Sequence, residues 1–408
     1  MPLPAFRHVD VGPVEHEGQT MICLQDPEGY VDAPVLLSPA AFLIATLLDG
    51  TNDILDIQYH FVNHTGRIIP AEDIHRIVAY LDEHGFLLTP RFDELSERIR
   101  KEFQEAATRP ARLAGKSYPA ESKELKSYLD ACFTREGGPG VLPVTVSGGD
   151  GPLKALIAPH IDFDRGGHSY AHAYLQLAKS STPKTAFVFG VAHGPTQTPF
   201  TLTRKHFETP FGAVPTDTGA VEALAGACAW DPFVDEMVHR TEHSIEFQVV
   251  MLRHIFGPEI AIVPILCGAF PEGPLLNNTA GGEGVQGFLR VCGEMVRERN
   301  GQACVIAGAD LAHVGKRFGD PFDIDDAITA QVEARDREDL AFVAALDADG
   351  WFRSVMKDGN RRRVCGVNCI YAALKTVEGY ATHAEVLHYG HAPDPAGGIV
   401  SFAGIAVS

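Results

Sequence analysis

Four histidines in the second half of the chain stand at positions where side chains often do chemistry. Three of them come shortly after apolar segments at 153–158, 185–190 and 304–309, and the fourth begins a helix predicted over 244–256. In that order they are His160, His193, His313 and His243. Imidazole is the most common side-chain ligand of transition-metal ions, and it also exchanges protons near neutral pH. The four positions therefore predict a metal site or an acid–base site.

The same region alternates short apolar strands with helices. We predict strands at 153–158, 185–190, 260–266 and 304–309, and helices at 168–179, 244–256 and 288–298. This alternation is typical of an α/β fold with a mostly parallel sheet that helices cover on both faces. Ligands of such sheets bind beyond the carboxyl ends of the strands. We therefore expect His160, His193 and His313 at one edge of the sheet.

Sequence motifs and charge exclude several classes of function. There is no G-x-G-x-x-G directly after a predicted strand, no P-loop, no H-E-x-x-H and no G-x-S-x-G. These absences argue against dinucleotide, nucleotide, zincin and serine-hydrolase chemistry. The formal charge of −19, from 34 basic and 53 acidic residues, argues against nucleic-acid binding. The densest basic cluster, Arg361-Arg362-Arg363, is predicted to be a solvated turn.

The N-terminus carries charges and prolines where a signal peptide needs an apolar core. No run of the roughly 18 to 20 apolar residues that a membrane helix needs is present. We therefore expect a soluble, cytoplasmic protein without a membrane partner. The eight cysteines lie mostly in apolar segments and are expected to be reduced and buried. Cys365 and Cys369 form a C-x-x-x-C pair, which alone is a weak indication of zinc.

The first 92 residues are predicted to form a small α+β domain. Ser38 and Pro39 begin one helix, two more are expected at 53–64 and 70–83, and short strands are expected around them and at 86–88. The pattern LSPAAFLIATLLDG followed by IHRIVAYLDEHGFL resembles PqqD-like winged-helix modules, which implies a peptide or protein partner. Residues 93–140 are charged and predicted to be a helical connector that ends at a Gly/Pro-rich break, so the main domain is expected at 141–408.

The second domain contains a series of motifs that occur together in one known family. They are 158–160 (APH), 170–174 (YAHAY), 190–193 (GVAH), 209–212 (TPFG), 242–246 (EHSIE), 262–268 (IVPILCG), 310–318 (DLAHVGKRF), 365–366 (CG) and 400–404 (VSFAG). In this order they resemble the Memo family, in the microbial form called AmmeMemoRadiSam system protein B. The resemblance implies a three-layer α/β/α domain similar in fold to class III extradiol dioxygenases. It also implies a radical-SAM protein as partner.

Carried over by position, the dioxygenase likeness implies non-haem Fe(II), with copper as another metal of this family. His160 and His193 would bind the metal and His243 would be the catalytic base. The third ligand stays open. In animal Memo proteins a cysteine precedes the histidine of the segment that matches 310–318, and this chain has Ala312 there. Candidates for the third ligand are Asp310, His313 and Asp162.

Further candidate site residues each have a structural alternative. Glu242 is expected either to orient the metal-site histidines or simply to favour a helix N-terminus by its charge. Arg165 could bind a substrate carboxylate or form a salt bridge with Asp162. Cys365 is expected to line the cleft or to be an ordinary buried thiol.

Three functions remain open from the sequence. The first is an iron- or copper-dependent redox enzyme that acts on a small molecule or peptide, with His243 moving a proton. The second is a zinc-dependent hydrolase with His243 or Glu242 as base. The third is a non-catalytic scaffold that binds a peptide or handles metal.

Overall fold

The structure is a computed structural model that describes residues 1–144, 152–270 and 280–408. The chain divides into two compact units, Met1–Ala106 and Ala107–Ser408. The first unit includes α4 (Pro90–Glu105), and α5 (Ser122–Thr134) belongs to the second. The domain bounds 1–92, 93–140 and 141–408 remain a prediction.

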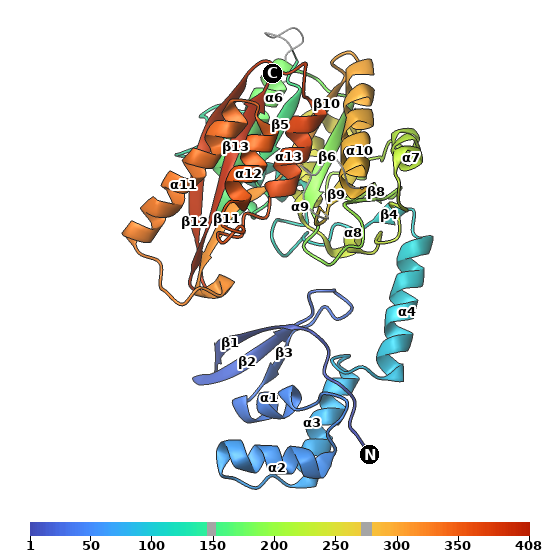
Figure 1. The fold of residues 1–408 in the computed structure, drawn as a ribbon, viewed down its shortest axis with the longest axis vertical. Coiled ribbons are helices and arrows are strands. Elements are labelled where there is room, and N and C mark those ends of the chain that lie inside the picture. The colour runs from blue at the N-terminus through green and yellow to red at the C-terminus, as the bar shows by residue number, and fades with distance from the viewer. Residues whose placement is uncertain (145–151, 271–279) are drawn as a thin grey trace. The chain divides into compact units, whose positions relative to one another are not determined.

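The first unit combines a small antiparallel sheet with helices (Figure 1). Its strands, in spatial order, are β1 (Asp10–His16), β2 (Gln19–Gln25) and β3 (Val35–Leu37). The helices are α1 (Pro39–Thr46), α2 (Ile54–Thr65), α3 (Ala71–Glu83) and α4. Segment 86–88 is not a strand and forms a single bridge between Phe6 and Leu87, which corrects the sequence prediction. The winged-helix assignment remains a prediction.

Local sequence explains where these helices begin. Ser38 accepts a hydrogen bond from the backbone N–H of Ala41 at 3.2 Å, with Pro39 at the first helical position. Asp53 caps α2 in the same way.

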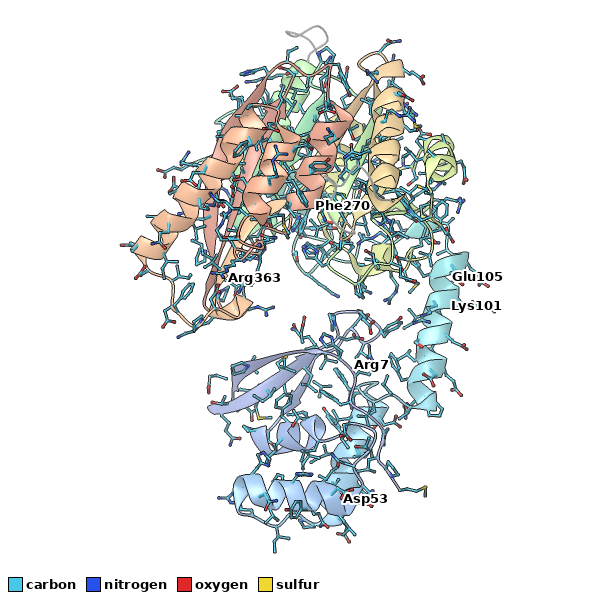
Figure 2. All side chains as sticks on the ribbon, viewed as in Figure 1. Arg7, Asp53, Lys101, Glu105, Phe270 and Arg363 are labelled. Carbon is cyan, nitrogen blue, oxygen red and sulfur yellow. The ribbon has the colours of Figure 1, made fainter. Side chains whose placement is uncertain are left out.

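A buried arginine attaches α4 to the rest of this unit. Arg7, labelled in Figure 2, is 4% exposed and pairs with Asp26 at 3.1 Å. Its guanidinium lies 3.9 Å from the ring centroid of Phe92, which fixes the first turn of α4 to this unit.

The second unit is built on a mixed sheet. Among the described residues it has eight strands, with the order β11-β13-β5-β10-β6-β9-β7 and β12 paired to β13. The strands are β5 (Ala155–Ala158), β6 (Thr185–Val191), β7 (Phe200–Leu202), β9 (Ala261–Cys267), β10 (Ala303–Gly308), β11 (Asp310–Gly315), β12 (Ala384–Asp394) and β13 (Gly398–Val407). The central strands β5, β10, β6 and β9 run parallel, so their carboxyl ends share one edge.

Helices cover both faces of this sheet (Figure 1). Alternate residues of each central strand enter two separate cores; in β6, Phe187 and Phe189 face one core and Ala186 and Val188 face the other. The first core is closed by α7 (Thr218–Ala227), α10 (Ala280–Glu298), α12 (Ala348–Met356) and α13 (Val367–Thr376). The second is closed by α5, α6 (Phe163–Ser180) and α9 (Ser244–Phe256). The predicted α/β fold is confirmed.

The sheet differs from the prediction next to the predicted site. We predicted a strand at 304–309 with His313 beyond its end, but β10 ends at Gly308 and a further strand, β11, begins at Asp310. β11 pairs antiparallel with β13, so His313 lies inside a strand and not at the end of one.

The remaining strands and α-helices of the second unit are β4 (Thr108–Arg109), β8 (His206–Phe207), α8 (Val238–Thr241) and α11 (Asp326–Ala344). No helix among the described residues is long and apolar enough to span a membrane.

Candidate metal centre

His160 lies just beyond the carboxyl end of β5 and is 2% exposed. Its ring Nδ1 lies 2.9 Å from the carbonyl oxygen of Gly308, and its backbone N–H donates to Asp310 Oδ1 at 2.9 Å. A carbonyl only accepts, so Nδ1 carries the proton and Nε2 keeps its lone pair. Burial lowers the pKa of this imidazole to about 3. His160 is therefore a neutral imidazole with Nε2 available as a ligand.

His193 follows β6, the second parallel strand from β5, and its side chain is held by Glu242. Nδ1 of His193 lies 3.1 Å from each carboxylate oxygen of Glu242, and the His193 backbone N–H donates to Glu242 Oε2 at 3.0 Å. This contact places the ring proton on Nδ1 and leaves Nε2 as the ligand atom.

His243 is the residue before α9, and the same carboxylate holds it. Its Nδ1 lies 3.2 Å from Glu242 Oε1. The backbone N–H groups of His243 and Ser244 donate to that oxygen at 2.8 and 2.9 Å. Glu242 is 5% exposed, so one buried carboxylate orients two imidazoles and satisfies the first N–H groups of α9. Glu242 therefore contacts both histidines and also accepts hydrogen bonds at the N-terminus of α9.

The three imidazoles form one cluster. Each of His160, His193 and His243 offers a ring nitrogen, and these atoms lie within 4.8 Å of one another. The ring of His160 stands at 88° to the other two, whose rings stack with centroids 4.8 Å apart. The side chains of His193 and His243 are 40% and 37% exposed. The cluster is therefore closed beneath His160 and open to solvent at the other two rings.

Cys365 and Asp310 border the cluster. Cys365 Sγ lies 3.4 Å from His160 Nε2, and Asp310 Oδ2 lies 3.6 Å from the same nitrogen. Burial raises the pKa of the Cys365 thiol to about 11 and also raises the pKa of Asp310. A bound cation would oppose both shifts, because it favours the ionised form of each group.

The charge state of His193 differs from that of the other two rings. Burial opposes a charged imidazole, but Glu242 outweighs it and raises the pKa of His193 well above its usual value. Burial likewise opposes the Glu242 carboxylate, but His193 and His243 bring the pKa of Glu242 well below its usual value. Burial lowers the pKa of His243 to about 4. A metal ion at His193 therefore has to displace a proton, which makes binding pH-dependent.

Other residues predicted for the site lie outside the cluster. His313 Nδ1 lies 3.1 Å from the carbonyl oxygen of Leu311, and His313 is not among the three residues whose donor atoms converge. Asp162 caps α6 and pairs with Arg165, with Arg165 Nε 2.7 Å from Asp162 Oδ2. Arg165 thus forms the salt bridge expected as the alternative to a substrate clamp. Ala312 packs in a small apolar cluster with Val314.

Arg109 positions the segment that carries Glu242 and His243, and no sequence pattern pointed to it. It is fully buried and donates to the carbonyl oxygens of His239 and Glu242. It also forms an ion pair with the buried carboxylate of Glu246, which accepts a further hydrogen bond from Tyr118. Glu246 therefore does not contact the histidines and instead ties the start of α9 to segment 109–118.

A second buried network holds the loop that carries Cys365. Arg362 pairs with Asp336 and Asp339 of α11, whose side chains are 1% and 2% exposed. Arg363, labelled in Figure 2, pairs with Asp320 at 2.9 Å. The prediction of a solvated turn at 361–363 is therefore wrong for Arg362. Its charge is offset by two aspartates that lie more than 20 residues away in sequence.

His239 gives this region a pH-dependent stability. It is 1% exposed, its Nε2 lies 3.0 Å from the Thr201 carbonyl oxygen, and burial lowers its pKa from 6.5 to about 3. The folded state thus resists protonation of His239. The contribution of neutral His239 to the unfolding free energy is fully present above the unfolded pKa of 6.5 and is lost as the pH falls from 6.5 toward 3. From about pH 7.5 to about pH 5 we expect wild type to lose about 2 kcal/mol more unfolding free energy than His239→Gln.

Urea unfolding followed by tryptophan fluorescence measures this difference, because Trp230 and Trp351 both lie in the second unit. The exposed His383→Gln variant is the control and should follow wild type. Parallel pH profiles for wild type and His239→Gln would refute the assignment.

Fold and site together define a class of protein: an α/β/α domain with a three-histidine cluster, oriented by a carboxylate, at the carboxyl edge of a mixed sheet. The profile of the Memo-like protein family matches residues 109–406. The chain therefore belongs to the Memo family. The match begins at Arg109, the residue that fixes the Glu242 segment.

Individual relatives agree with this assignment. A MEMO1 family protein of Aquifex aeolicus is 28% identical over 98% of this chain and 99% of its own length. One from Methanopyrus kandleri is 31% identical over 72% of this chain and 95% of its own length. One from Thermus thermophilus is 29% identical over 78% and 88%. The likeness to the Aquifex protein extends over nearly the whole chain.

Proposed function

We propose that this protein binds a redox-capable transition-metal ion, iron or copper, through His160, His193 and His243, and uses it in an oxidation of a small molecule or peptide. The observation that carries the proposal is the convergence of three imidazole nitrogens within 4.8 Å. Glu242 holds two of these rings with Nδ1 protonated, so that Nε2 is the ligand atom.

The donor set fits this group of metals. Imidazole suits iron, copper, zinc and nickel, and the adjacent Cys365 adds a soft donor that favours copper or zinc over magnesium or calcium. Three imidazoles leave coordination positions for a substrate. A bound iron or copper ion would supply one-electron redox chemistry with O₂ at this place.

The chain's own groups would then have separate tasks. His160 supplies a neutral ligand at the closed base of the site, and His193 supplies a ligand whose proton leaves on metal binding. Asp310, at 3.6 Å from His160 Nε2, supplies negative charge beside the ion. The solvent-exposed sides of His193 and His243 give a substrate its approach. The alternative role of His243, as a base that moves a proton, requires that metal binding survive its removal.

A zinc-dependent hydrolase is the second candidate. The observation in its favour is the three-histidine set itself, which also occurs in catalytic zinc sites. Glu242 is already occupied by two imidazoles and three backbone N–H groups, so His243 is the better candidate base. His243 could take that role only if Asp310 or Cys365, which lie beside His160 Nε2, replaced it as the third ligand.

The proposal also includes partners. The resemblance to AmmeMemoRadiSam system protein B supports a radical-SAM protein as partner, and the winged-helix-like pattern of the first unit supports a peptide. If no metal binds, the remaining hypothesis is a scaffold that recognises such a partner without catalysis.

Metal content by mass spectrometry of anaerobically purified protein tests the function. We expect about one iron or copper ion per chain in wild type, and loss of that ion in His160→Ala and His193→Ala because each removes a ligand. His313→Ala is the control and should keep the metal. Loss of the metal ion in His243→Ala would show that His243 is a ligand. Retention of the metal ion in this variant would favour His243 as the base.

Three outcomes would change the proposal. Zinc in place of iron or copper would support the hydrolase, which is active without O₂. Metal retained in His160→Ala would move the site elsewhere. Absence of any bound metal ion in wild type would leave the non-catalytic scaffold as the remaining hypothesis.

A further inference from the structure

A cavity lies in the second unit, at the amino ends of the central strands β5 and β10. Its volume is about 310 Å³, at the lower end of the range for small-molecule sites. Lys154 precedes β5 and Ala303 begins β10, and both residues line this cavity. β5 and β10 are parallel, and His160 follows the carboxyl end of β5. The cavity and the metal centre therefore lie at opposite edges of the sheet.

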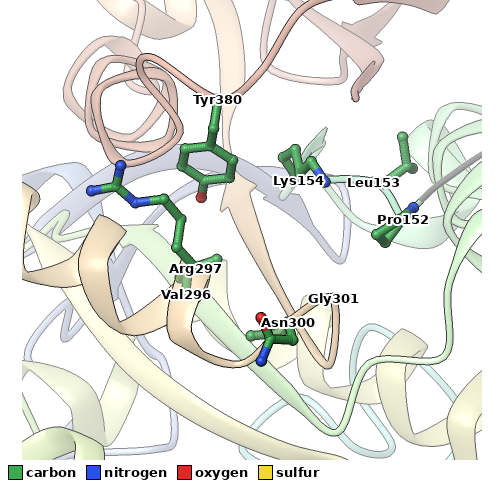
Figure 3. A pocket seen from close by; sticks show the side chains of 9 residues that line it. Pro152, Leu153, Lys154, Val296, Arg297, Asn300, Gly301 and Tyr380 are labelled. Carbon is green, nitrogen blue, oxygen red and sulfur yellow. The ribbon is translucent and has the colours of Figure 1, made fainter.

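The cavity has a rigid base. The backbone N–H of Lys154 donates to Val407 at 2.8 Å, and its carbonyl accepts from Val305 at 2.9 Å, so both neighbouring strands fix this residue. Asn300 and Gly301 form a tight turn with φ of +49° and +81°. Figure 3 shows these residues around the cavity, with Tyr380 and Arg297 on the facing wall.

The polar groups of the lining are mostly hydrogen-bond donors. Lys154 and Arg297 are cationic, and no carboxylate is among the lining residues that the structure describes. Neither cation has an acidic partner within the described parts of the chain. A pocket of donors with unopposed positive charge favours an anion.

Tyr380 provides an independent observation. Its hydroxyl oxygen is shielded from solvent and has no hydrogen-bond partner among the described residues. Buried hydroxyls without a partner are uncommon, because losing a hydrogen bond to water costs about 1–3 kcal/mol. In Figure 3 the hydroxyl points in the direction of the turn at Asn300 and Gly301. The guanidinium of Arg297 lies 5.5 Å from the Tyr380 ring centroid, so a cation lies beside this ring.

We propose that this cavity is a binding site for a small organic anion with a carboxylate or phosphate group. The oxyanion would accept from the Lys154 ammonium and, once the Tyr380 side chain turns toward the cavity, from its hydroxyl, with Arg297 also in the lining. Because the site lies at the opposite edge of the sheet from the histidine cluster, its ligand is distinct from any molecule that reacts at the metal.

Isothermal titration calorimetry of the full chain with inorganic phosphate, and separately with succinate, tests the site at low salt. We expect wild type to bind one equivalent of at least one of the two, with Kd of about 1 mM or tighter. Lys154→Met should weaken binding about tenfold or more, because it removes a charged donor. Tyr380→Phe should weaken it about threefold or more, because it removes one neutral hydrogen bond.

Lys179→Met is the matched control, since Lys179 is an exposed lysine of α6 that does not line the cavity. It should bind like wild type, and circular dichroism should show that all variants are folded. Preference for phosphate or for succinate identifies the group that the site takes. Absence of binding by wild type, or affinity unchanged in both Lys154→Met and Tyr380→Phe, would overturn the proposal. Metal content should not change in these variants, so the two sites are tested separately.

Discussion

Glu242→Gln should bind its metal ion about 10 to 100 times more weakly than wild type, the range found when a group that orients a ligand histidine is lost. The carboxylate accepts from the Nδ1 atoms of both His193 and His243 and from three backbone N–H groups. An amide presents one oxygen and one N–H₂ group, so it cannot accept at all of these positions. At least one imidazole would lose its orientation and its fixed tautomer.

Competition with a chelator of known affinity measures the change. The apo protein offers a second measurement, because loss of the Glu242 charge should lower the pKa of His193 toward its ordinary value, which NMR titration of the imidazole detects. Glu222→Gln, an exposed carboxylate that pairs with Arg204, is the control. Wild-type affinity in Glu242→Gln would show that the carboxylate does not orient the ligands.

Arg109→Met should lower the unfolding free energy of the second unit by about 3–5 kcal/mol, the usual cost of leaving one charge of a buried pair without its partner. Arg109 and Glu246 have side chains 0% and 1% exposed, so water cannot replace the lost ion pair. The carbonyl oxygens of His239 and Glu242 would also lose a donor. The segment that carries Glu242 and His243 would then be less well fixed, and metal affinity should fall too.

The double variant Arg109→Met/Glu246→Gln separates charge from packing. It removes both charges, so we expect it to be more stable than Arg109→Met alone. Urea unfolding followed by tryptophan fluorescence measures the unfolding free energy of wild type, Arg109→Met and the double variant. Arg337→Met, which breaks an exposed pair with Glu333, should cost less than about 1 kcal/mol. A similarly small loss in Arg109→Met would contradict the positioning role.

Much of the histidine cluster was predictable because its residues follow a local rule. His160 and His193 come directly after apolar strands, and parallel strands bring their carboxyl ends to one edge. His243 begins a helix whose apolar spacing is visible in the sequence, and the structure has that helix at Ser244–Phe256. Such positions depend on periodicity and chain direction, which short windows of sequence contain.

His313 shows where that rule fails. It follows an apolar segment as the other histidines do, but a separate strand begins at Asp310 and pairs antiparallel with β13. The pairing partner, Gly398–Val407, is more than 80 residues away. Strand pairing over such a separation depends on which edges are available after the central strands have assembled, and no local pattern encodes it.

The residues and their spacing were thus enough to predict the family, the α/β class and the edge of the sheet at which two histidines lie. The packed fold was needed to show that Glu242 contacts His193 and His243, that Cys365 lies against His160, and that Arg109 is buried. It also decided that Arg362 lies in an ion-pair network and that Lys154 and Tyr380 share a cavity. The physical reason is burial: a charged side chain looks alike in sequence whether water or a distant partner offsets its charge, and the choice is made only when the layers pack.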